Sequence, residues 1–387
     1  MPPLTIPGFR ARVPLVAQKM YVNNCSPGVL SEDVQDAMTA FMQSWNEAGS
    51  PWEHWVGVVE QLRTAFARLI GATPDEVAVM PSASAGINAI ASALGFDGTR
   101  RHVVAGEFEF PTMGQIWLAQ ERRGARVIWA RAEGHALPVD SYAAAIDERT
   151  LLVACSRVCY KNGFHTDVAA VARLCRERGA YMLLDDYQFT GSGRTNVREL
   201  GVDFMVTGCL KYLLGPSGVA FLYVRRELID RLEPTITGWF GRVNPFEFRA
   251  DRLDWAPSAR RFESGTPPVP NAYGALAGIE LLQRVGLDAV ERHVAELVGL
   301  AIDRAHHSGY DVSTSRDPAR RGPLVVVRSR DAQQLVPRLL QRGVITSARD
   351  GGLRLAFHAY NTVEDVERAF SALAAEDALL ERVVRAG

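Results

Sequence analysis

Short apolar runs alternate with helical patterns between residues 76 and 224, and this alternation constrains the fold more than any other feature of the chain. Seven runs predict strands: EVAVM, HVVA, RVIWA, LLVAC, YMLLD, DFMVT and VAFLYV. Strands that are apolar on both faces and separated by helices are typical of a mostly parallel sheet with helices on both faces. In such open α/β sheets, ligands bind beyond the carboxyl ends of the strands.

The rest of the chain divides around this sheet. We expect an N-terminal segment at 1–30 that packs near the site, a large α/β domain at 31–275 and a small α+β domain at 276–387. Helical spacing predicts helices at 31–45 and 52–70, with Trp45, Trp52 and Trp55 in the core. The small domain should hold strands at 310–315, 323–329, 343–348 and 353–357, and helices near 287–307, 331–341 and 362–375.

Composition argues against several classes of function. The formal net charge is -1 and no Lys/Arg run stands out, so nucleic acid and anionic membranes have little support as partners. No window approaches the roughly 18 uninterrupted apolar residues of a membrane span, and residues 1–13 lack a secretory apolar core. The five cysteines are scattered, without disulfide-framework or metal-site spacing. We therefore expect a cytoplasmic protein with reduced thiols and no metal.

The run GCLKYLLGP, which contains Lys211, carries the clearest chemical signal. It follows strand YMLLD, which ends at Asp185, and Gln188 lies three residues beyond that carboxylate. Pyridoxal phosphate needs these groups, because a lysine forms a Schiff base with its aldehyde and a carboxylate pairs with its pyridinium nitrogen. Gln188 is expected to bond the ring hydroxyl oxygen, whereas Asp186 points the opposite way and is expected to be structural.

Two further segments fit the phosphate and the ring of this cofactor. Strand EVAVM runs into PSASAGIN, where small residues such as Ala83 let an anion approach a helix start and Ser84 adds a hydroxyl. On this segment alone an ordinary serine N-cap is the simpler explanation, but the lysine motif favours a phosphate site. Phe110 is expected to stack on the ring, and it is preferred over Phe108 because Pro111 marks a turn into a helix.

These motifs resemble those of the class V branch of fold-type-I pyridoxal-phosphate enzymes, which includes cysteine desulfurases, kynureninases and isopenicillin N epimerase-like proteins. The likeness extends from YVNN, at 21–24, to YNTVED, at 360–365. It implies the mostly parallel seven-stranded sheet, a smaller α+β C-terminal domain, and Lys211 as the Schiff-base lysine. It also implies that Arg354 binds the substrate carboxylate through two parallel hydrogen bonds. The resembling enzymes share active sites in a homodimer, and Thr266 matches a stretch that reaches the neighbouring subunit's phosphate.

The chain also departs from the patterns of these enzymes. Desulfurases have a hydroxyl and a histidine where this chain has Gly208 and Leu210, so Thr207 is the expected substitute at the phosphate. Residues 343–354 have no cysteine to carry a persulfide. Kynureninases usually have histidine in place of Gln188. Cys25, Tyr160 and Trp239 are expected to contact the substrate. For Cys25 and Trp239, packing in the core is the alternative.

The reaction is the least constrained feature. We expect an enzyme in which Lys211 is the general base and the substrate is a small-molecule amino acid. A lyase that cleaves a β-substituent, of the C–S lyase type and without persulfide relay, is favoured. A class V aminotransferase is the alternative, and an epimerase or an oxidative decarboxylase or deaminase is a further one. A degenerate protein that only binds the cofactor would lack the lysine or the arginine, and both are present.

Overall fold

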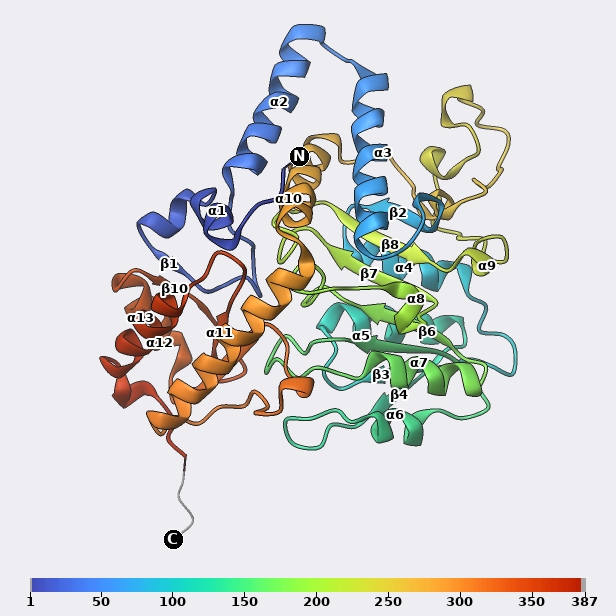
Figure 1. The fold of residues 1–387 in the computed structure, drawn as a ribbon. Helices are drawn as coiled ribbons and strands as arrows, with labels where there is room; N and C mark the ends of the chain where they lie inside the picture. Colours follow the sequence, from blue (N-terminus) through green and yellow to red (C-terminus); the bar gives the residue numbers. More distant parts are fainter. Residues whose placement is uncertain (1, 384–387) are drawn as a thin grey trace.

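The computed structural model describes residues 2–383 and confirms the predicted seven-stranded sheet at the centre of the molecule (Figure 1). Its strand order is β2-β8-β7-β6-β5-β3-β4. Only β8 runs against its neighbours, so the other six strands end at one common edge. The strands are β2 (Val77–Met80), β3 (His102–Gly106), β4 (Arg126–Ala130), β5 (Thr150–Ser156), β6 (Tyr181–Asp185), β7 (Phe204–Gly208) and β8 (Ala220–Val224).

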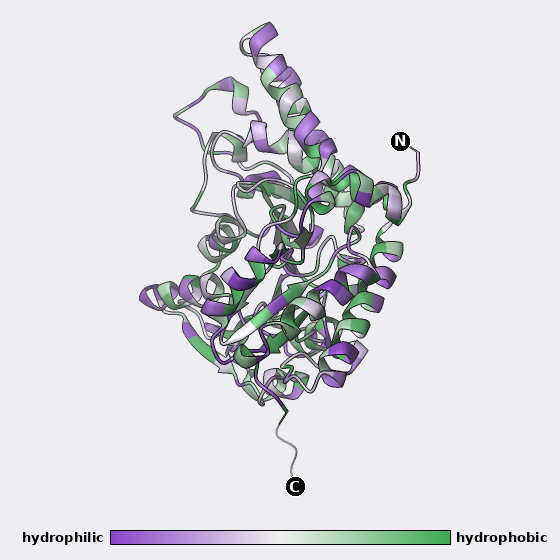
Figure 2. Cartoon of the chain, turned by 90° about the vertical axis from the view of Figure 1, so that its left-hand side faces the viewer, coloured by the Kyte–Doolittle hydropathy of each residue, from purple (hydrophilic) through white to green (hydrophobic). Residues whose placement is uncertain are grey.

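Both faces of the sheet are covered by helices, because alternate residues of each strand point to opposite sides. In β6, Leu183 packs on the side covered by α4 (Ala83–Ala93) and α5 (Pro111–Ala119). Leu184 packs on the other side with α3 (Trp52–Leu69) and α7 (Val168–Glu177). Figure 2 shows the hydrophobic residues concentrated in this interior. Shorter helices complete the layers: α6 (Val139–Ala145), α8 (Val197–Leu200) and α9 (Arg226–Ile229).

The helix α2 (Glu32–Ala48) forms a hairpin with α3 that projects beyond the body of the molecule (Figures 1 and 2). Trp55 is buried, at 8% exposure, and Trp52 is partly buried. The prediction of a core position is wrong for Trp45, which is 57% exposed on α2. The reason is geometric, since the helical spacing continues along α2 beyond the point where the hairpin leaves the sheet.

A smaller α+β unit holds most of the C-terminal residues. Its antiparallel sheet has the order β11-β12-β9, and β1 (Met20–Tyr21) pairs in parallel with β10, which brings residues 20–24 alongside it. The predicted domain boundary at residue 275 falls within α10. Residues 1 and 384–387, which belong to the predicted terminal segments, lie outside the described residues. The remaining elements are α1 (Ile6–Ala11), α10 (Val269–Val285), α11 (Leu287–His307), β9 (Leu324–Arg328), α12 (Ala332–Gln341), β10 (Val344–Ile345), β11 (Ser347–Arg349), β12 (Gly352–Ala356) and α13 (Val363–Ala374).

The predicted strand at 310–315 is wrong. This stretch makes only isolated bridges, at Tyr310 and Val312. The Thr314 hydroxyl replaces part of the backbone hydrogen bonding of a strand. It donates to the Asn162 carbonyl at 2.7 Å and accepts from the Val326 amide at 2.9 Å. Threonine side chains compete in this way with regular backbone pairing.

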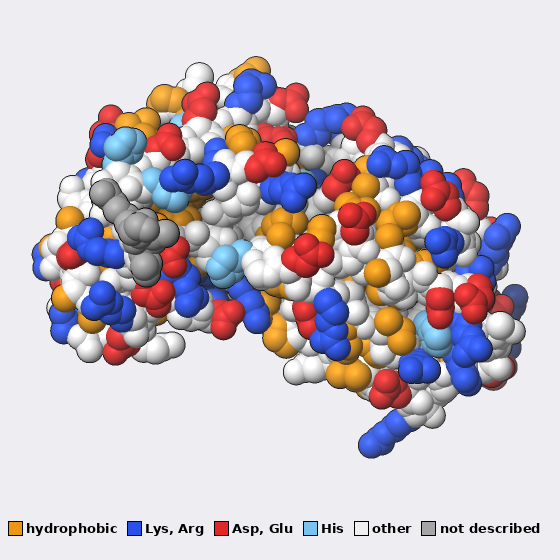
Figure 3. Space-filling view, turned by 90° about the horizontal axis from the view of Figure 1, so that it is seen from below, with side chains coloured by type: hydrophobic (Ala, Val, Ile, Leu, Met, Phe, Trp, Pro, Cys, Tyr) orange, Lys and Arg blue, Asp and Glu red, His pale blue; other side chains and the backbone are white. Residues whose placement is uncertain are grey.

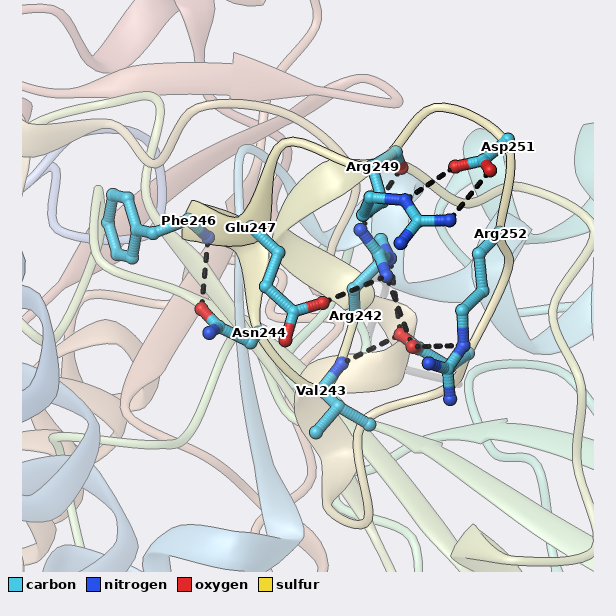
Figure 4. A network of polar contacts seen from close by, with 9 residues as sticks. Arg242, Val243, Asn244, Phe246, Glu247, Arg249, Asp251 and Arg252 are labelled. Atoms are coloured by element: carbon cyan, nitrogen blue, oxygen red, sulfur yellow. Dashed lines mark hydrogen bonds and ion pairs between the residues drawn. The ribbon is translucent and has the colours of Figure 1, made fainter.

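A long connection between α9 and α10 is held by charged contacts. The Arg242 guanidinium donates from two nitrogens to Asp254, each at 3.1 Å, and Arg252 pairs with the same carboxylate (Figure 4). The connection displays apolar side chains to solvent, among them Phe248 at 74% exposure, which stacks with Trp239. Several large apolar side chains are therefore exposed together on this connection, which is typical of a surface that contacts another molecule.

Elsewhere the surface carries charges of both signs. Figure 3 shows acidic and basic side chains interspersed over the face seen from below, without a broad field of one sign. Within residues 2–383, no helix is both long enough and apolar enough to cross a membrane.

Candidate active site

A cavity of about 330 Å³ lies at the edge of the sheet where six strands end. Its walls come from the turns after β2, β3, β5, β6 and β7 and from the residues that lead into β8. It therefore occupies the position where open α/β sheets bind ligands. Seven of the residues predicted from the sequence line it, namely Ala83, Ser84, Phe110, Tyr160, Asp185, Gln188 and Lys211.

Lys211 lies in the turn between β7 and β8, and its amine enters the cavity between two aromatic rings. Nζ is 4.4 Å from the ring centroid of Tyr187 and 5.7 Å from that of Phe110. Burial lowers the pKa of Lys211 to about 8, although Asp185 opposes the shift. An amine with such a pKa has a substantial neutral fraction near neutral pH, as a nucleophile and a base require. His358 supports this turn, since its Nε2 contacts the Tyr212 carbonyl at 2.9 Å.

Asp185 is the last residue of β6 and is buried at the cavity wall. It accepts a hydrogen bond from the Tyr187 amide at 3.0 Å. Burial raises the pKa of Asp185, and the nearby Lys211 opposes this. A buried carboxylate is costly without a cationic partner, so this position favours a ligand with a positive group. Asp186 is turned away from the cavity and pairs with Arg157 at 2.7 Å.

Gln188 offers an open hydrogen-bonding position. Its Nε2 donates to the Cys25 carbonyl at 3.0 Å, while its Oε1 is buried without a partner among the described residues. A buried polar atom without a partner costs free energy that a ligand can recover. The Thr207 hydroxyl is also buried and unpartnered within residues 2–383, but Thr207 does not line the cavity.

The start of α4 forms a part of the cavity wall that attracts anions, whereas Asp185 favours a positive group. Ser82 is the N-cap, because its hydroxyl accepts from the Ala85 amide at 3.1 Å. Ser84 is therefore not the cap, and its hydroxyl bonds that of Thr112 at 2.8 Å. The first amides of a helix lack intrahelical partners and attract anions. The buried carboxylate, the open amide carbonyl and this helix start match the ring nitrogen, ring oxygen and phosphate of pyridoxal phosphate.

The two aromatic candidates after β3 have different positions. Phe110 is 45% exposed, lines the cavity and packs edge-on against Tyr160, with ring centroids 5.1 Å apart. Phe108 instead packs into the core against Phe164. The turn at Pro111 thus separates a core aromatic from one that faces the ligand space, as expected from the sequence.

Five predicted residues lie outside the cavity wall: Cys25, Thr207, Trp239, Thr266 and Arg354. Arg354 is only 2% exposed and donates to the hydroxyls of Ser26 and Ser347, each at 2.7 Å. It also donates to the Tyr160 carbonyl at 3.1 Å, so it lies directly behind a cavity residue. Trp239 and Thr266 belong to the connection between α9 and α10, and neither lines the cavity of its own chain.

The sequence pattern did not indicate that Tyr187 shapes the cavity. A side chain at Gly208 would collide with the phenol of Tyr187. The tyrosine therefore fills the space that a hydroxyl-bearing residue at 208 would need. The available signal was the DDYQ run itself, in which Tyr187 adjoins Asp186 and Gln188.

The sequence pattern also gave no role to Glu109, although this residue adjoins Phe110. Its buried carboxyl accepts from the Ser156 amide at 2.8 Å, and its Oε2 is 2.5 Å from the Ser156 hydroxyl. Burial raises the pKa of Glu109 to about 8, and the charge of Asp185 contributes. This shift favours the protonated form of Glu109 at neutral pH. The signal was an acidic residue between two phenylalanines in the run FEF.

The raised pKa of Glu109 predicts that the free energy of unfolding depends on pH. Since the pKa of Glu109 is near its usual low value in the unfolded chain and about 8 in the folded one, stability should fall between these values as pH rises. The loss is about 1.4 kcal/mol per pH unit while only the unfolded state ionises. Glu109→Gln stays neutral, so its stability relative to the wild type should increase with pH and level off above about 8.

Urea unfolding of both proteins across this pH range measures the effect. Glu107→Gln is the matched control, because Glu107 belongs to the same turn but is partly exposed and pairs with Arg131. Its stability difference from the wild type should not grow with pH. A pH-independent difference for Glu109→Gln would show that the buried carboxyl is ionised throughout.

Comparisons with known proteins agree with this geometry. The family model Aminotransferase class-V matches residues 20–369. The chain is 34% identical to the "Uncharacterized aminotransferase YcbU" of Bacillus subtilis, over 95% of this chain and 97% of that protein. It is 28% identical to a kynureninase of Bacillus anthracis, over 90% of this chain and 86% of the relative.

Solved structures show the same fold. An apo cysteine desulfurase from Thermococcus onnurineus superposes with a TM-score of 0.86 at 21% identity, covering 98% of this chain and 99% of that one. The cystine C-S lyase C-DES, bound to its product cysteine persulfide, gives 0.84 at 22% identity, covering 94% and 99%. The sheet is thus that of fold-type-I pyridoxal-phosphate proteins. The chain belongs to the aminotransferase class-V family and is a pyridoxal-phosphate-dependent lyase or aminotransferase.

Proposed function

We propose that this enzyme is a lyase that cleaves a β-substituent from a cysteine-derived amino acid without a persulfide relay. The observation that carries the proposal is the absence of a thiol from residues 343–354, which form β10, β11 and β12 around Arg354. The thiol of Cys25 is buried, with Sγ 4.0 Å from the Ser347 hydroxyl. A relay requires a reactive thiol that is accessible to a sulfur acceptor, and a buried one does not meet this requirement.

The residues of the site support β-elimination. Bound pyridoxal phosphate supplies an electron sink for a bond at the substrate Cα. Lys211 takes the Cα proton, and Asp185 keeps the ring nitrogen protonated. Arg354 binds the substrate carboxylate in place of the hydroxyls of Ser26 and Ser347. With these residues in place, the substrate Cβ–S bond would break with its electron pair on sulfur, which would take up a proton. The released enamine would tautomerise to an imine, and hydrolysis of this imine would give a keto acid and ammonia.

The other site residues are assigned to binding. We assign Gln188 to the ring oxygen, Phe110 to the ring face, and Ala83 and Ser84 to the phosphate. Tyr160 is assigned to the substrate side chain. Cys25 lies outside the cavity wall, and we assign it to the substrate end of the site because its Sγ is 4.0 Å from the hydroxyl of Ser347, which bonds Arg354. Thr207 does not line the cavity, but its buried hydroxyl lacks a partner among the described residues. We therefore assign this hydroxyl to the phosphate as a hydrogen-bond donor from behind the cavity wall.

Names of similar proteins favour two chemistries. The cystine C-S lyase is named for cleavage of a C–S bond, which supports the lyase. The 34% identical relative is named an aminotransferase, which supports the alternative. An epimerase or an oxidative decarboxylase or deaminase would use the same Lys211 and has no comparable support.

The decisive assay uses a panel of S-substituted cysteines, with pyruvate, ammonia, free thiol, alanine and side-chain-bearing keto acid measured separately. We expect pyruvate, ammonia and thiol in equal amounts without an added amino acceptor. An aminotransferase would instead require a keto-acid acceptor and leave the C–S bond intact. Alanine formation with transferable sulfur would contradict the absence of a relay. Kynurenine is included as a substrate because the 28% identical relatives are named kynureninases.

We further propose that the enzyme is a homodimer with shared active sites. Apolar side chains are exposed on two projecting elements, with Met42 and Trp45 on α2 and Phe246 and Phe248 on the α9–α10 connection. Burial of such surface against a second copy would be favourable. Thr266 is exposed and the 238–241 turn packs on Ser264, so Trp239 would approach a partner's site together with Thr266.

Mixing two inactive variants tests this sharing. Lys211→Ala and Thr266→Arg lesions would fall in the same site of a heterodimer if the partner supplies Thr266, which leaves the second site intact. After subunit exchange we expect activity well above that of either parent. Thr235→Arg is the matched control for a surface threonine, and its mixture with Lys211→Ala should show no gain beyond the simple sum. A fully active monomer by light scattering would contradict the proposal.

The state of the thiols supports the cytoplasmic location that we propose. All five cysteines, Cys25, Cys155, Cys159, Cys175 and Cys209, are buried and free. Burial raises the pKa of Cys159 to about 11, so this thiol stays protonated. Unpaired thiols are usual in reducing compartments.

A further inference from the structure

Glu109, Ser156 and Asp185 lie in a row along the cavity edge of three neighbouring strands. Glu109 follows β3, Ser156 ends β5 and Asp185 ends β6, in the sheet order β6-β5-β3. Ser156 and Asp185 are register partners, so their side chains project from the same face of the sheet. Both line the cavity, whereas Glu109 is buried behind Ser156.

The contact between Glu109 and Ser156 can exist in two forms. An ionised carboxyl has no proton to donate, so the Ser156 hydroxyl must donate to Oε2 across their 2.5 Å separation. A protonated carboxyl can donate to the Ser156 oxygen instead, which frees the serine proton to point into the cavity. The Ser156 amide bonds Oε1 at 2.8 Å and fixes the carboxyl in either form.

We propose that Glu109 is a positioning residue whose proton decides whether the Ser156 hydroxyl donates a hydrogen bond into the cofactor cavity or away from it. With Glu109 protonated, the serine hydroxyl supplies a donor beside the Asp185 carboxylate, which stabilises the charge that pairs with the ring nitrogen. With Glu109 ionised, this donor is lost. The proton leaves to or arrives from solvent, and no other bond changes.

The groups that face Glu109 do not titrate in the same range. Burial raises the pKa of Cys155 and Tyr142 well above their usual values and that of Cys159 to about 11. Asp185 faces it from β6 and favours the neutral form of Glu109. Lys211 lines the same cavity as Ser156, and burial lowers its pKa to about 8, into the range in which Glu109 titrates. An experiment must therefore separate Glu109 from Lys211.

Infrared spectroscopy of the cofactor-free protein tests the protonation directly. The difference spectrum between wild type and Glu109→Gln should contain a carboxylic-acid carbonyl band at neutral pH, which a lysine cannot produce. The band should disappear above about 8. Its absence at neutral pH would overturn the proposal.

A double-mutant cycle tests whether Glu109 acts through Ser156. The affinity of the cofactor-free protein for pyridoxal phosphate is measured against pH for wild type, Glu109→Gln, Ser156→Ala and the double variant. The glutamine amide donates to Ser156 at every pH, so it mimics the protonated acid. The Lys211 titration is common to all four proteins and cancels in the ratios.

Wild type and Glu109→Gln should bind the cofactor equally below about 8. Above it the wild type should bind about tenfold more weakly, as expected for loss of a hydrogen bond to a charged group. This divergence should vanish in the Ser156→Ala background, and Glu107→Gln should follow the wild type. A divergence that persists without the serine hydroxyl, or tighter binding by the wild type at high pH, would overturn the proposal.

Discussion

Lys211→Ala is expected to lower turnover roughly 10³-fold or more, because in the proposed mechanism one amine both attaches the cofactor and moves the substrate proton. Among the described residues that line the cavity, Lys211 is the only lysine, arginine or histidine. No other side chain there can take over as a base with a pKa near neutrality. Steady-state turnover and the absorbance of the lysine-linked cofactor measure the two functions separately.

Lys161→Ala is the matched control. Lys161 is partly exposed and lies 3.8 Å from Asp350, outside the cavity. This variant should keep wild-type absorbance and turnover. Turnover by Lys211→Ala at close to the wild-type rate would contradict the assignment of the base.

Asp185→Asn is expected to bind the cofactor but to turn over on the order of 10² times more slowly. The neutral amide cannot hold the ring nitrogen in its protonated form, so the ring withdraws electrons from the substrate less strongly. The residue is buried at the cavity wall and bonded to the Tyr187 amide, so the substitution preserves its shape. Turnover and cofactor affinity, measured on the same preparation, distinguish lost chemistry from lost binding.

Asp203→Asn controls for the loss of a buried carboxylate. Asp203 precedes β7 at the opposite end of the sheet, where it accepts from the Met182 amide at 2.8 Å and pairs with Arg225. Its replacement should lower stability while leaving turnover of the folded enzyme unchanged. Equal loss of turnover in both variants would mean that Asp185 acts only through folding.

Much of the fold could be predicted because its signals are local. Each buried strand is a short apolar run, and the helical spacing at 287–307 coincides with α11. The positions of Ala83, Phe110, Asp185 and Lys211 followed from a general rule, since turns after parallel strands meet at one edge. These residues do line a common cavity.

Periodicity could not predict contacts between distant segments. The Cys25 carbonyl meets Gln188, and the Ser26 hydroxyl meets Arg354, although these partners are far apart along the chain. Periodicity also could not show that Trp45 lies on a projecting helix, or that Thr314 replaces strand pairing with side-chain bonds. Each of these depends on the arrangement of elements rather than on the pattern within one of them.

The central claim, that Lys211 carries the cofactor, is tested most directly by reducing the enzyme–cofactor linkage with borohydride and identifying the labelled peptide by mass spectrometry. The chain has only three lysines, Lys19, Lys161 and Lys211, so the outcome is unambiguous. We predict that the pyridoxyl label is found on Lys211 alone and is absent from Lys211→Ala. A label on Lys19 or Lys161, or labelling that survives in Lys211→Ala, would contradict the claim.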